Sequence, residues 1–251
     1  KNIVPGWYPQ CRKCDLSQSN FNNSKLFKAD LQFSELWKST FKNADLRQAN
    51  LSGSDLSESN FDKSNLFRGN LKWADLWKSS FKRANLSRSK FDESDLSYSD
   101  FSDAKLVDAS FWNVDLIASN LQGADLTNAD LSFSDLRRSN LKKAKLTNTD
   151  FHQSNLWGSD LRGVDFEKAD LSRIWMSDSD LSRSNLRGAD LSNSWVDGSD
   201  LRFADLSNAD LWRADFSDTC LFQAKLNGAY LQKADLSNAD LRGADLFSAD
   251  L

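Results

Sequence analysis

Histidine and methionine are almost absent from this chain, with one residue of each, and proline occurs only twice in 251 residues. No apolar run approaches the eighteen or so residues that a membrane span needs. Only one closely spaced pair of cysteines is present, Cys11 and Cys14, with no second pair to complete a four-ligand zinc site. We therefore expect neither a membrane-spanning protein nor a zinc site with four cysteine ligands.

The chain instead repeats every five residues, without insertion or deletion, from Leu16 to Leu251. Each of the 48 pentapeptides has a large apolar centre, which is Leu in 36 cases and Phe in ten, and the residue two before it is Ala or Ser in 41. A period of five fits neither an α-helix nor a continuous β-strand. We predict a short extended segment and a corner in each pentapeptide, with the centre directed inward.

Residues twenty positions apart tend to be of the same type. Five of the Phe centres, namely Phe21, Phe41, Phe61, Phe81 and Phe101, recur at this interval. Four pentapeptides are therefore predicted to form one square coil, and stacked coils bury a continuous core. The result is an all-β rod of about twelve coils, roughly 58 Å long at about 4.8 Å per coil.

Segments such as ADLSNADL and GADLFSADL resemble the A(D/N)LXX pattern of the pentapeptide-repeat family. The resemblance covers about 95% of the chain. It implies a right-handed quadrilateral β-helix over residues 14–251. It implies little about function, because most members of the family have no assigned activity.

The chain shows no signature of an enzyme. No Ser-His-Asp grouping, phosphate-binding glycine loop or calcium-binding nonapeptide is present. The single histidine, His152, follows a centre, where side chains are expected to face water. Of the 36 acidic residues, 26 directly precede a centre, so none is singled out as a general acid or base. We expect a non-enzymatic protein without a cofactor.

The two ends of the repeat differ. Residues 1–13 lie outside it, and we expect them to form an N-terminal cap, because an open coil exposes unpaired strand edges. The repeat continues to Leu251 with nothing behind it. We expect the last coil either to continue in the natural protein or to meet another molecule.

Cys11 and Cys14 either form a local disulfide in an oxidising compartment or belong to a redox or metal site. The run CRKCDLS resembles the opening of many bacterial and cyanobacterial family members that follow an export signal. That resemblance implies an exported protein of the periplasm, the thylakoid lumen or the cell exterior. A cytoplasmic protein is the alternative.

Acidic residues are stacked along one side of the predicted rod. Seven consecutive coils carry Asp15, Glu35, Asp55, Asp75, Asp95, Asp115 and Asp135, which we name the acidic ladder. Related gyrase inhibitors of the quinolone-resistance branch are understood as mimics of duplex DNA. Duplex DNA of this length carries about 34 charges, whereas the net charge here is −4 and 24 Lys or Arg follow the centres. Inhibition of a DNA-binding enzyme by DNA mimicry is therefore an alternative function, and binding to nucleic acid is not expected.

Aromatic residues that directly precede or follow the centres are expected to point outward, and they gather around one edge of the rod. Exposed aromatic patches usually mark interaction sites. The sequence therefore predicts a contact surface for a protein partner or for a second copy of the chain. Its residues are Trp37, Trp73, Trp77, Trp112, Trp157, Trp175, Trp195, Trp212, Phe33 and Phe133.

Two other interpretations of these aromatic residues stay open. Trp side chains repeated along a rigid rod can stack on a glycan chain, which makes a glycan-binding module the second alternative function. They can also lie flat across the corners and shield the core. Trp175 and Trp195, which replace the acids of the ladder beyond Asn155, mark the place where we expect a preferred contact.

Overall fold

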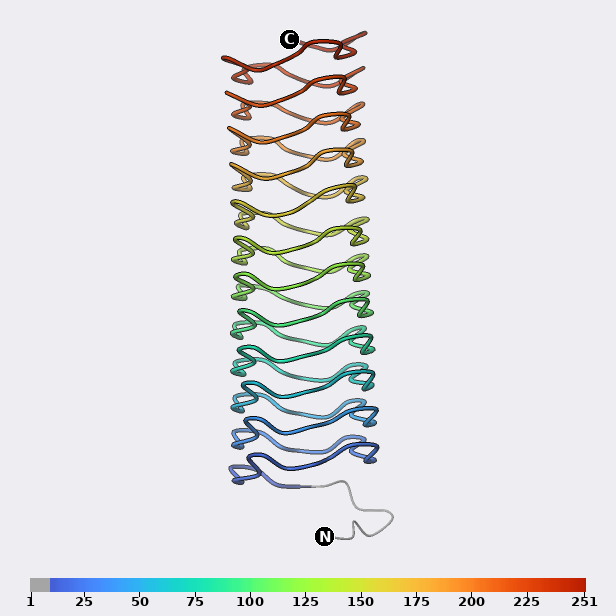
Figure 1. The fold of residues 1–251 in the computed structure, drawn as a ribbon, viewed down its shortest axis with the longest axis vertical. Helices are drawn as coiled ribbons and strands as arrows, with labels where there is room; N and C mark the ends of the chain where they lie inside the picture. The colour runs from blue at the N-terminus through green and yellow to red at the C-terminus, as the bar shows by residue number, and fades with distance from the viewer. Residues whose placement is uncertain (1–9) are drawn as a thin grey trace.

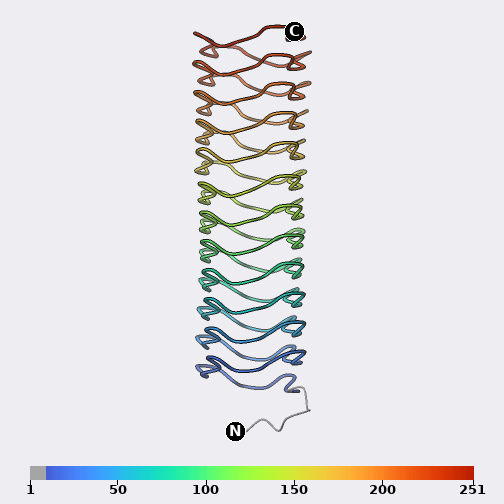
Figure 2. The ribbon, with the colours of Figure 1, turned by 90° about the vertical axis from the view of Figure 1, so that its right-hand side faces the viewer.

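The computed structural model describes residues 10–251 as a single rod of stacked coils that wind in a right-handed sense (Figure 1). This range contains no α-helix and no continuous strand. Every fifth residue forms an isolated parallel β-bridge to the residue twenty positions on, from Gln10 with Asp30 to Tyr230 with Asp250. One coil therefore has twenty residues and four sides, and the predicted right-handed quadrilateral β-helix is confirmed. The perpendicular view shows the same regular stack (Figure 2).

Each corner is a tight turn that the repeat encodes. In the corner after Leu36, the N–H of Ser39 donates to the Leu36 carbonyl at 3.1 Å, and Lys38 has a φ of 55°. The Asp or Asn before a centre accepts a hydrogen bond from the N–H two residues on, as Asp55 does from Ser57 at 3.0 Å. Asp and Asn are favoured in turns because their side chains make this bond. The recurring acid is therefore explained by the turn.

Backbone hydrogen bonds join each coil to the next. The N–H of Leu36 donates to the carbonyl of Asp55 at 2.7 Å, and the N–H of Asp55 donates to the carbonyl of Ser34 at 3.1 Å. The same pair of bonds recurs along the rod. All pentapeptides thus have nearly the same backbone, and they differ in the side chains that they present.

The core is a column of centres sealed from solvent. Phe41, Phe61 and Phe81 have no exposed surface, and successive rings lie 4.6 to 4.9 Å apart. Offset or edge-on aromatic pairs of this kind stabilise a core beyond the area they bury. The serine two before a centre is buried too, and Ser59 donates its hydroxyl proton to the Leu36 carbonyl at 2.8 Å. Many of the serines at this position donate to backbone carbonyls inside the rod in the same way.

The N-terminal segment is only partly described. Gln10 already forms a bridge with Asp30, so residues 10–13 of the predicted cap belong to the first coil. The rest of the predicted cap, residues 1–9, lies outside the described residues. Cys11 and Cys14 are joined by a disulfide bond. Within residues 10–251, no helix is long and apolar enough to cross a membrane.

Candidate contact surface

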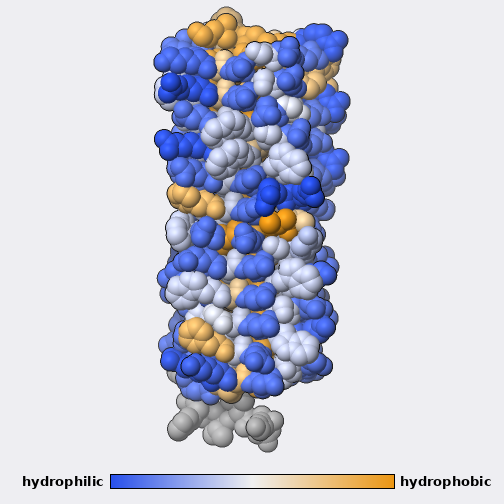
Figure 3. All heavy atoms as spheres, turned by 90° about the vertical axis from the view of Figure 1, so that its left-hand side faces the viewer, coloured by the Kyte–Doolittle hydropathy of each residue, from blue (hydrophilic) through white to orange (hydrophobic). Residues whose placement is uncertain are grey.

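One flat side of the rod brings the predicted aromatic residues and the acidic ladder together. Its inward centres are Leu16 and every twentieth residue after it, and we name this side, with its two bordering corners, the contact face. The acidic ladder lies along its middle, Phe33 lies on one corner and Trp37 on the other. Figure 3 shows a side of the rod on which pale and orange side chains flank a narrow blue strip. The contact face is therefore an acidic strip bordered by aromatic groups.

Trp175 and Trp195 take the place of ladder acids in two successive coils. Their rings are stacked, with centroids 5.1 Å apart and planes 8° from parallel. Each keeps about two fifths of its surface exposed, at 42% and 40%. Beneath them the core is bulkier than usual, because the fully buried residues include Ile174 and Met176. The two indoles form a rigid apolar projection from the middle of the face.

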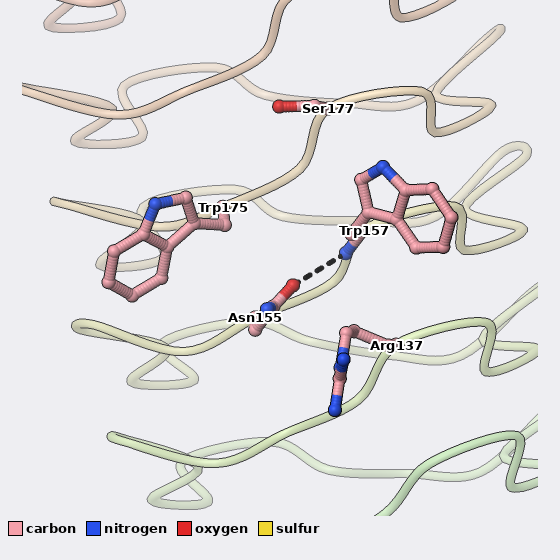
Figure 4. Close-up of a pocket in the computed structure, with 5 residues that line it drawn as sticks. All are labelled: Arg137, Asn155, Trp157, Trp175 and Ser177. Atoms are coloured by element: carbon pink, nitrogen blue, oxygen red, sulfur yellow. Dashed lines mark hydrogen bonds between the residues drawn. The ribbon is translucent and has the colours of Figure 1, made fainter.

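A recess lies directly below this projection. It has a volume of about 380 Å³ and is lined by Arg137, Asn155, Trp157, Trp175 and Ser177. Figure 4 shows the indoles of Trp157 and Trp175 on either side of the short Asn155, whose side-chain oxygen accepts a hydrogen bond from the backbone N–H of Trp157 at 3.0 Å. The recess is thus bordered by two indoles and by the polar side chains of Arg137, Asn155 and Ser177.

A second recess lies on the other side of the projection. It has a volume of about 530 Å³ and is lined by two arginines among its six residues: Arg173, Asn193, Ser194, Trp195, Arg213 and Asp215. Asn155, Asn193 and the arginines were not among the residues predicted from the sequence. Their signal is positional, because each lies within a coil or two of the Trp pair.

Most of the other predicted tryptophans are covered by their own cations. Lys78 lies 4.1 Å from the ring centroid of Trp77, and Arg138 lies 5.1 Å from that of Trp157. Cations also lie over the rings of Trp37 and Trp212. Cation–π contacts of this kind contribute about 0.5–1 kcal/mol at exposed sites. These indoles are thus partly occupied within the chain.

The remaining predicted aromatics lie on the corner that precedes the ladder. Trp73 is 57% exposed and Phe33 is 52% exposed. Trp112 is packed edge-on against Phe133, with ring centroids 6.2 Å apart. Tyr98, which was not among the predicted contact residues, packs edge-on against Trp77 at 6.5 Å. The structure therefore places all ten predicted contact residues on the contact face or its corners, but it does not gather them into one patch.

The acidic ladder is largely unpaired. Asp135 forms a salt bridge with Arg137 at 2.6 Å. Within residues 10–251 the other six ladder acids form none. Partial burial, and then the charges of Asp55 and Asp95, raise the pKa of Asp75. Partial burial, and then the charges of Asp95 and Asp135, raise the pKa of Asp115. Electrostatic repulsion within the ladder therefore acts on Asp75 and Asp115.

Replacing Asp75 by Asn is expected to stabilise the rod by about 0.2–1 kcal/mol at neutral pH, the usual size of a cross-strand charge effect. The amide still accepts the hydrogen bond from the Trp77 N–H, at 3.0 Å in the wild type, and the repulsion is lost. A raised folded-state pKa penalises folding at high pH, and the penalty disappears as pH falls through that pKa toward 3.8. The gain should therefore shrink on acidification, as measured by urea unfolding at several pH values.

Asp160→Asn is the matched control for this substitution. A hydrogen bond from Arg162, at 2.7 Å, lowers the pKa of Asp160. A lowered pKa contributes stability at neutral pH that is lost as the carboxylate becomes protonated. This variant should be less stable than the wild type at neutral pH. Equal effects of the two substitutions would contradict the electrostatic explanation.

The hydrogen bonds around His152 run in the wrong direction for nucleophilic catalysis. Its Nδ1 lies 2.8 Å from the Ser172 hydroxyl, and that hydroxyl donates its proton to Asp170 at 2.6 Å. An activated serine must instead give its proton to the histidine. His152 is half-buried, not fully exposed as expected. Among the described residues, no group of three or more His, Cys, Asp or Glu side chains is arranged to hold a metal ion.

Comparisons with known proteins agree with this architecture. The family model described as "Pentapeptide repeats (8 copies)" matches residues 10–41, 39–67, 144–183, 184–223 and 224–251. A second model, "Pentapeptide repeat region", matches residues 64–140. No curated protein sequence matches the chain.

Several solved structures resemble the rod. HetL, a pentapeptide repeat protein involved in heterocyst differentiation regulation in the cyanobacterium Nostoc sp., is 27% identical; the match covers 94% of this chain and 89% of HetL, with a TM-score of 0.35. QnrB1, a plasmid-mediated fluoroquinolone resistance protein, is 19% identical over 76% of this chain and 86% of its own, with a TM-score of 0.48. A protein of the Arabidopsis thaliana thylakoid lumen is 28% identical over 38% of this chain and 66% of its own, with a TM-score of 0.21. The family models match most of the chain, and the chain therefore belongs to the pentapeptide-repeat family.

Proposed function

We propose that this protein is a non-enzymatic binding protein that uses the contact face to hold a protein partner. The observation that carries the proposal is the stacked pair of Trp175 and Trp195, exposed between two recesses. Protein interfaces are centred on aromatic and arginine anchors set in pockets and surrounded by polar groups. The recess below the pair has such walls, with Trp157 and Arg137 on its rim.

The two alternative functions have weaker support. DNA mimicry requires a dense and unneutralised negative surface, but many acids outside the ladder are paired, for example Asp200 with Arg202 and Asp240 with Arg242. Glycan stacking requires open indole faces, and a cation lies over one face of the rings of Trp37, Trp77 and Trp212. The half-buried positions of Trp37, Trp77 and Trp212 support a role in covering the corners.

Export remains part of the proposal. Disulfide bonds persist in oxidising compartments and are rare in the cytosol. The Cys11–Cys14 bond therefore supports a protein of the periplasm, the thylakoid lumen or the cell exterior.

A photo-crosslinking scan in native extract tests the proposed function. A photoreactive residue at position 157, on the contact face, is expected to give a discrete protein adduct, and the same residue at position 222, on another side, is not. Changing Trp175 and Trp195 to Ala should reduce the adduct by at least about thirtyfold, because the loss of even one central aromatic anchor costs about 2 kcal/mol or more. Equal labelling from both positions would overturn the proposal, and retention on polysaccharide instead would favour the glycan alternative.

A further inference from the structure

We propose that the protein held by the contact face is a second copy of the chain, in an antiparallel dimer in which each copy inserts Trp175 over Asn155 of its partner. The inference rests on the proposed function, that the contact face binds protein. The shape of the contact face is the first observation that supports a dimer. Trp175 and Trp195 project from the middle column of the face, and the two residues before them in that column, Asn155 and Asp135, are short. A projection two coils long therefore adjoins a longer stretch of the same column, residues 55 to 155, that carries only Asp or Asn.

Two rods can be packed face to face by a two-fold axis that lies in the interface and runs across the rods. A column here is the set of residues that follow one another at intervals of twenty along the rod. The two-fold operation places each column of one rod opposite the same column of the other rod and reverses the order of the coils, as an isologous contact requires. With the axis between the coils of Asn155 and Trp175, the Trp175 side chain faces Asn155 of the partner, and Trp195 faces Asp135. The projection of each copy then fills the space above the short residues of the other.

The spacing of the indoles fits this arrangement. Coils lie about 4.8 Å apart, and the rings of Trp175 and Trp195 are already stacked at 5.1 Å. The four indoles therefore form one stack, in the order Trp195, Trp175, and then Trp175 and Trp195 of the partner. Each inserted Trp175 enters the recess of about 380 Å³ and lies against its Trp157 wall. Aromatic side chains buried in this way dominate the energy of an interface.

The charges at the corners fit the same register. Arg137 lies opposite Asp197 of the partner, and the two-fold axis creates this pair twice. Arg137 already bonds Asp135, and Asp197 accepts the hydroxyl proton of Ser177 but forms no salt bridge within residues 10–251. Further from the axis, Lys233 lies opposite Glu93, and neither has an ion-pair partner in the part of the chain that the structure describes. Complementary charges of this kind fix the register of an interface.

The two nearest registers on the C-terminal side fit less well. An axis between the coils of Trp175 and Trp195 sets the two projections against each other, so that the rods are held apart. An axis one coil further on, beyond Trp195, uses the recess of about 530 Å³ but sets Arg173 against Lys233. The proposed register also contains pairs of like charge: Asp115 faces Asp215 of the partner, and Asp95 faces the partner's Asp235. They lie outside the indole stack, at the ends of the contact.

Sedimentation velocity of the purified chain over a range of concentrations tests the proposal with two matched substitutions. The wild type is expected to dimerise with a dissociation constant of about 1–10 µM, as suits an interface at the lower end of the standard size. Asn155→Trp fills the recess with the chain's own indole and should weaken the dimer by about tenfold or more. Asp215→Trp adds an indole at the outer end of the stack and should change the affinity by less than about threefold.

Both positions lie in the column that already holds Trp175 and Trp195, so both variants should fold, as circular dichroism and thermal unfolding will show. A dimer lost in Asp215→Trp but kept in Asn155→Trp would overturn the proposed register. Asp197→Arg should weaken the dimer, and Arg137→Asp in the same chain should restore it. A wild type that stays monomeric at all concentrations would overturn the proposed dimer. The proposed function is tested separately by the crosslinking experiment, and it would fail if position 157 crosslinked to no protein.

Discussion

Phe81→Ala is expected to destabilise the rod by about 3–5 kcal/mol, the range for removing a buried phenylalanine ring. Phe81 has no exposed surface. Its ring is stacked between those of Phe61 and Phe101, at 4.9 and 4.8 Å, and packs edge-on against Phe91 at 6.0 Å. The backbone ladder holds the coils above and below at a fixed spacing, so the cavity left by the substitution cannot collapse.

Phe81→Leu is the control, because Leu is the centre of 36 of the 48 pentapeptides. We expect it to lower the free energy of unfolding by less than about 1.5 kcal/mol, as swaps between large apolar residues usually do. Urea unfolding followed by two probes measures both variants and shows whether the rod unfolds in one step. A loss below about 1 kcal/mol for Phe81→Ala would contradict the description of a rigid aromatic column.

The architecture was predictable because the repeat determines both the turn and the core. A centre every fifth residue sets the corner, and the recurrence of Phe21 and its successors at twenty sets the number of sides. The stacking of Trp175 on Trp195 followed from the same interval. Any feature that depends only on a residue's place within the twenty-residue coil could be predicted from its residue number.

The candidate site was less predictable, because side chains at the corners choose their own rotamers. The interval of twenty places Trp77 and Trp157 in one column, but it does not show that Lys78 and Arg138 cover their rings. Nor does it show that the ladder acids other than Asp135 form no salt bridge within residues 10–251, while Asp200 pairs with Arg202. The recess at Asn155 depends on a contrast of size between neighbouring coils, and side-chain packing was needed to find it.

The central claim is that function depends on which residues share the contact face, and not on the rod as such. Because all pentapeptides share one backbone, deleting five residues should leave a folded rod in which everything beyond the deletion turns by one side. Deleting residues 181–185 moves Trp195 onto the next side, away from Trp175. Deleting residues 121–125, which also begin with a Leu of the same column, leaves Trp157, Trp175 and Trp195 in register.

Sedimentation velocity of these two deletion variants, beside the wild type, is the most direct measurement. Both variants should give the circular dichroism spectrum of the wild type. We predict that the variant lacking residues 121–125 retains the dimer, with an affinity within about threefold of the wild type, and that the variant lacking residues 181–185 loses at least about tenfold. Equal affinities in the two variants, whether both kept or both lost, would contradict the account.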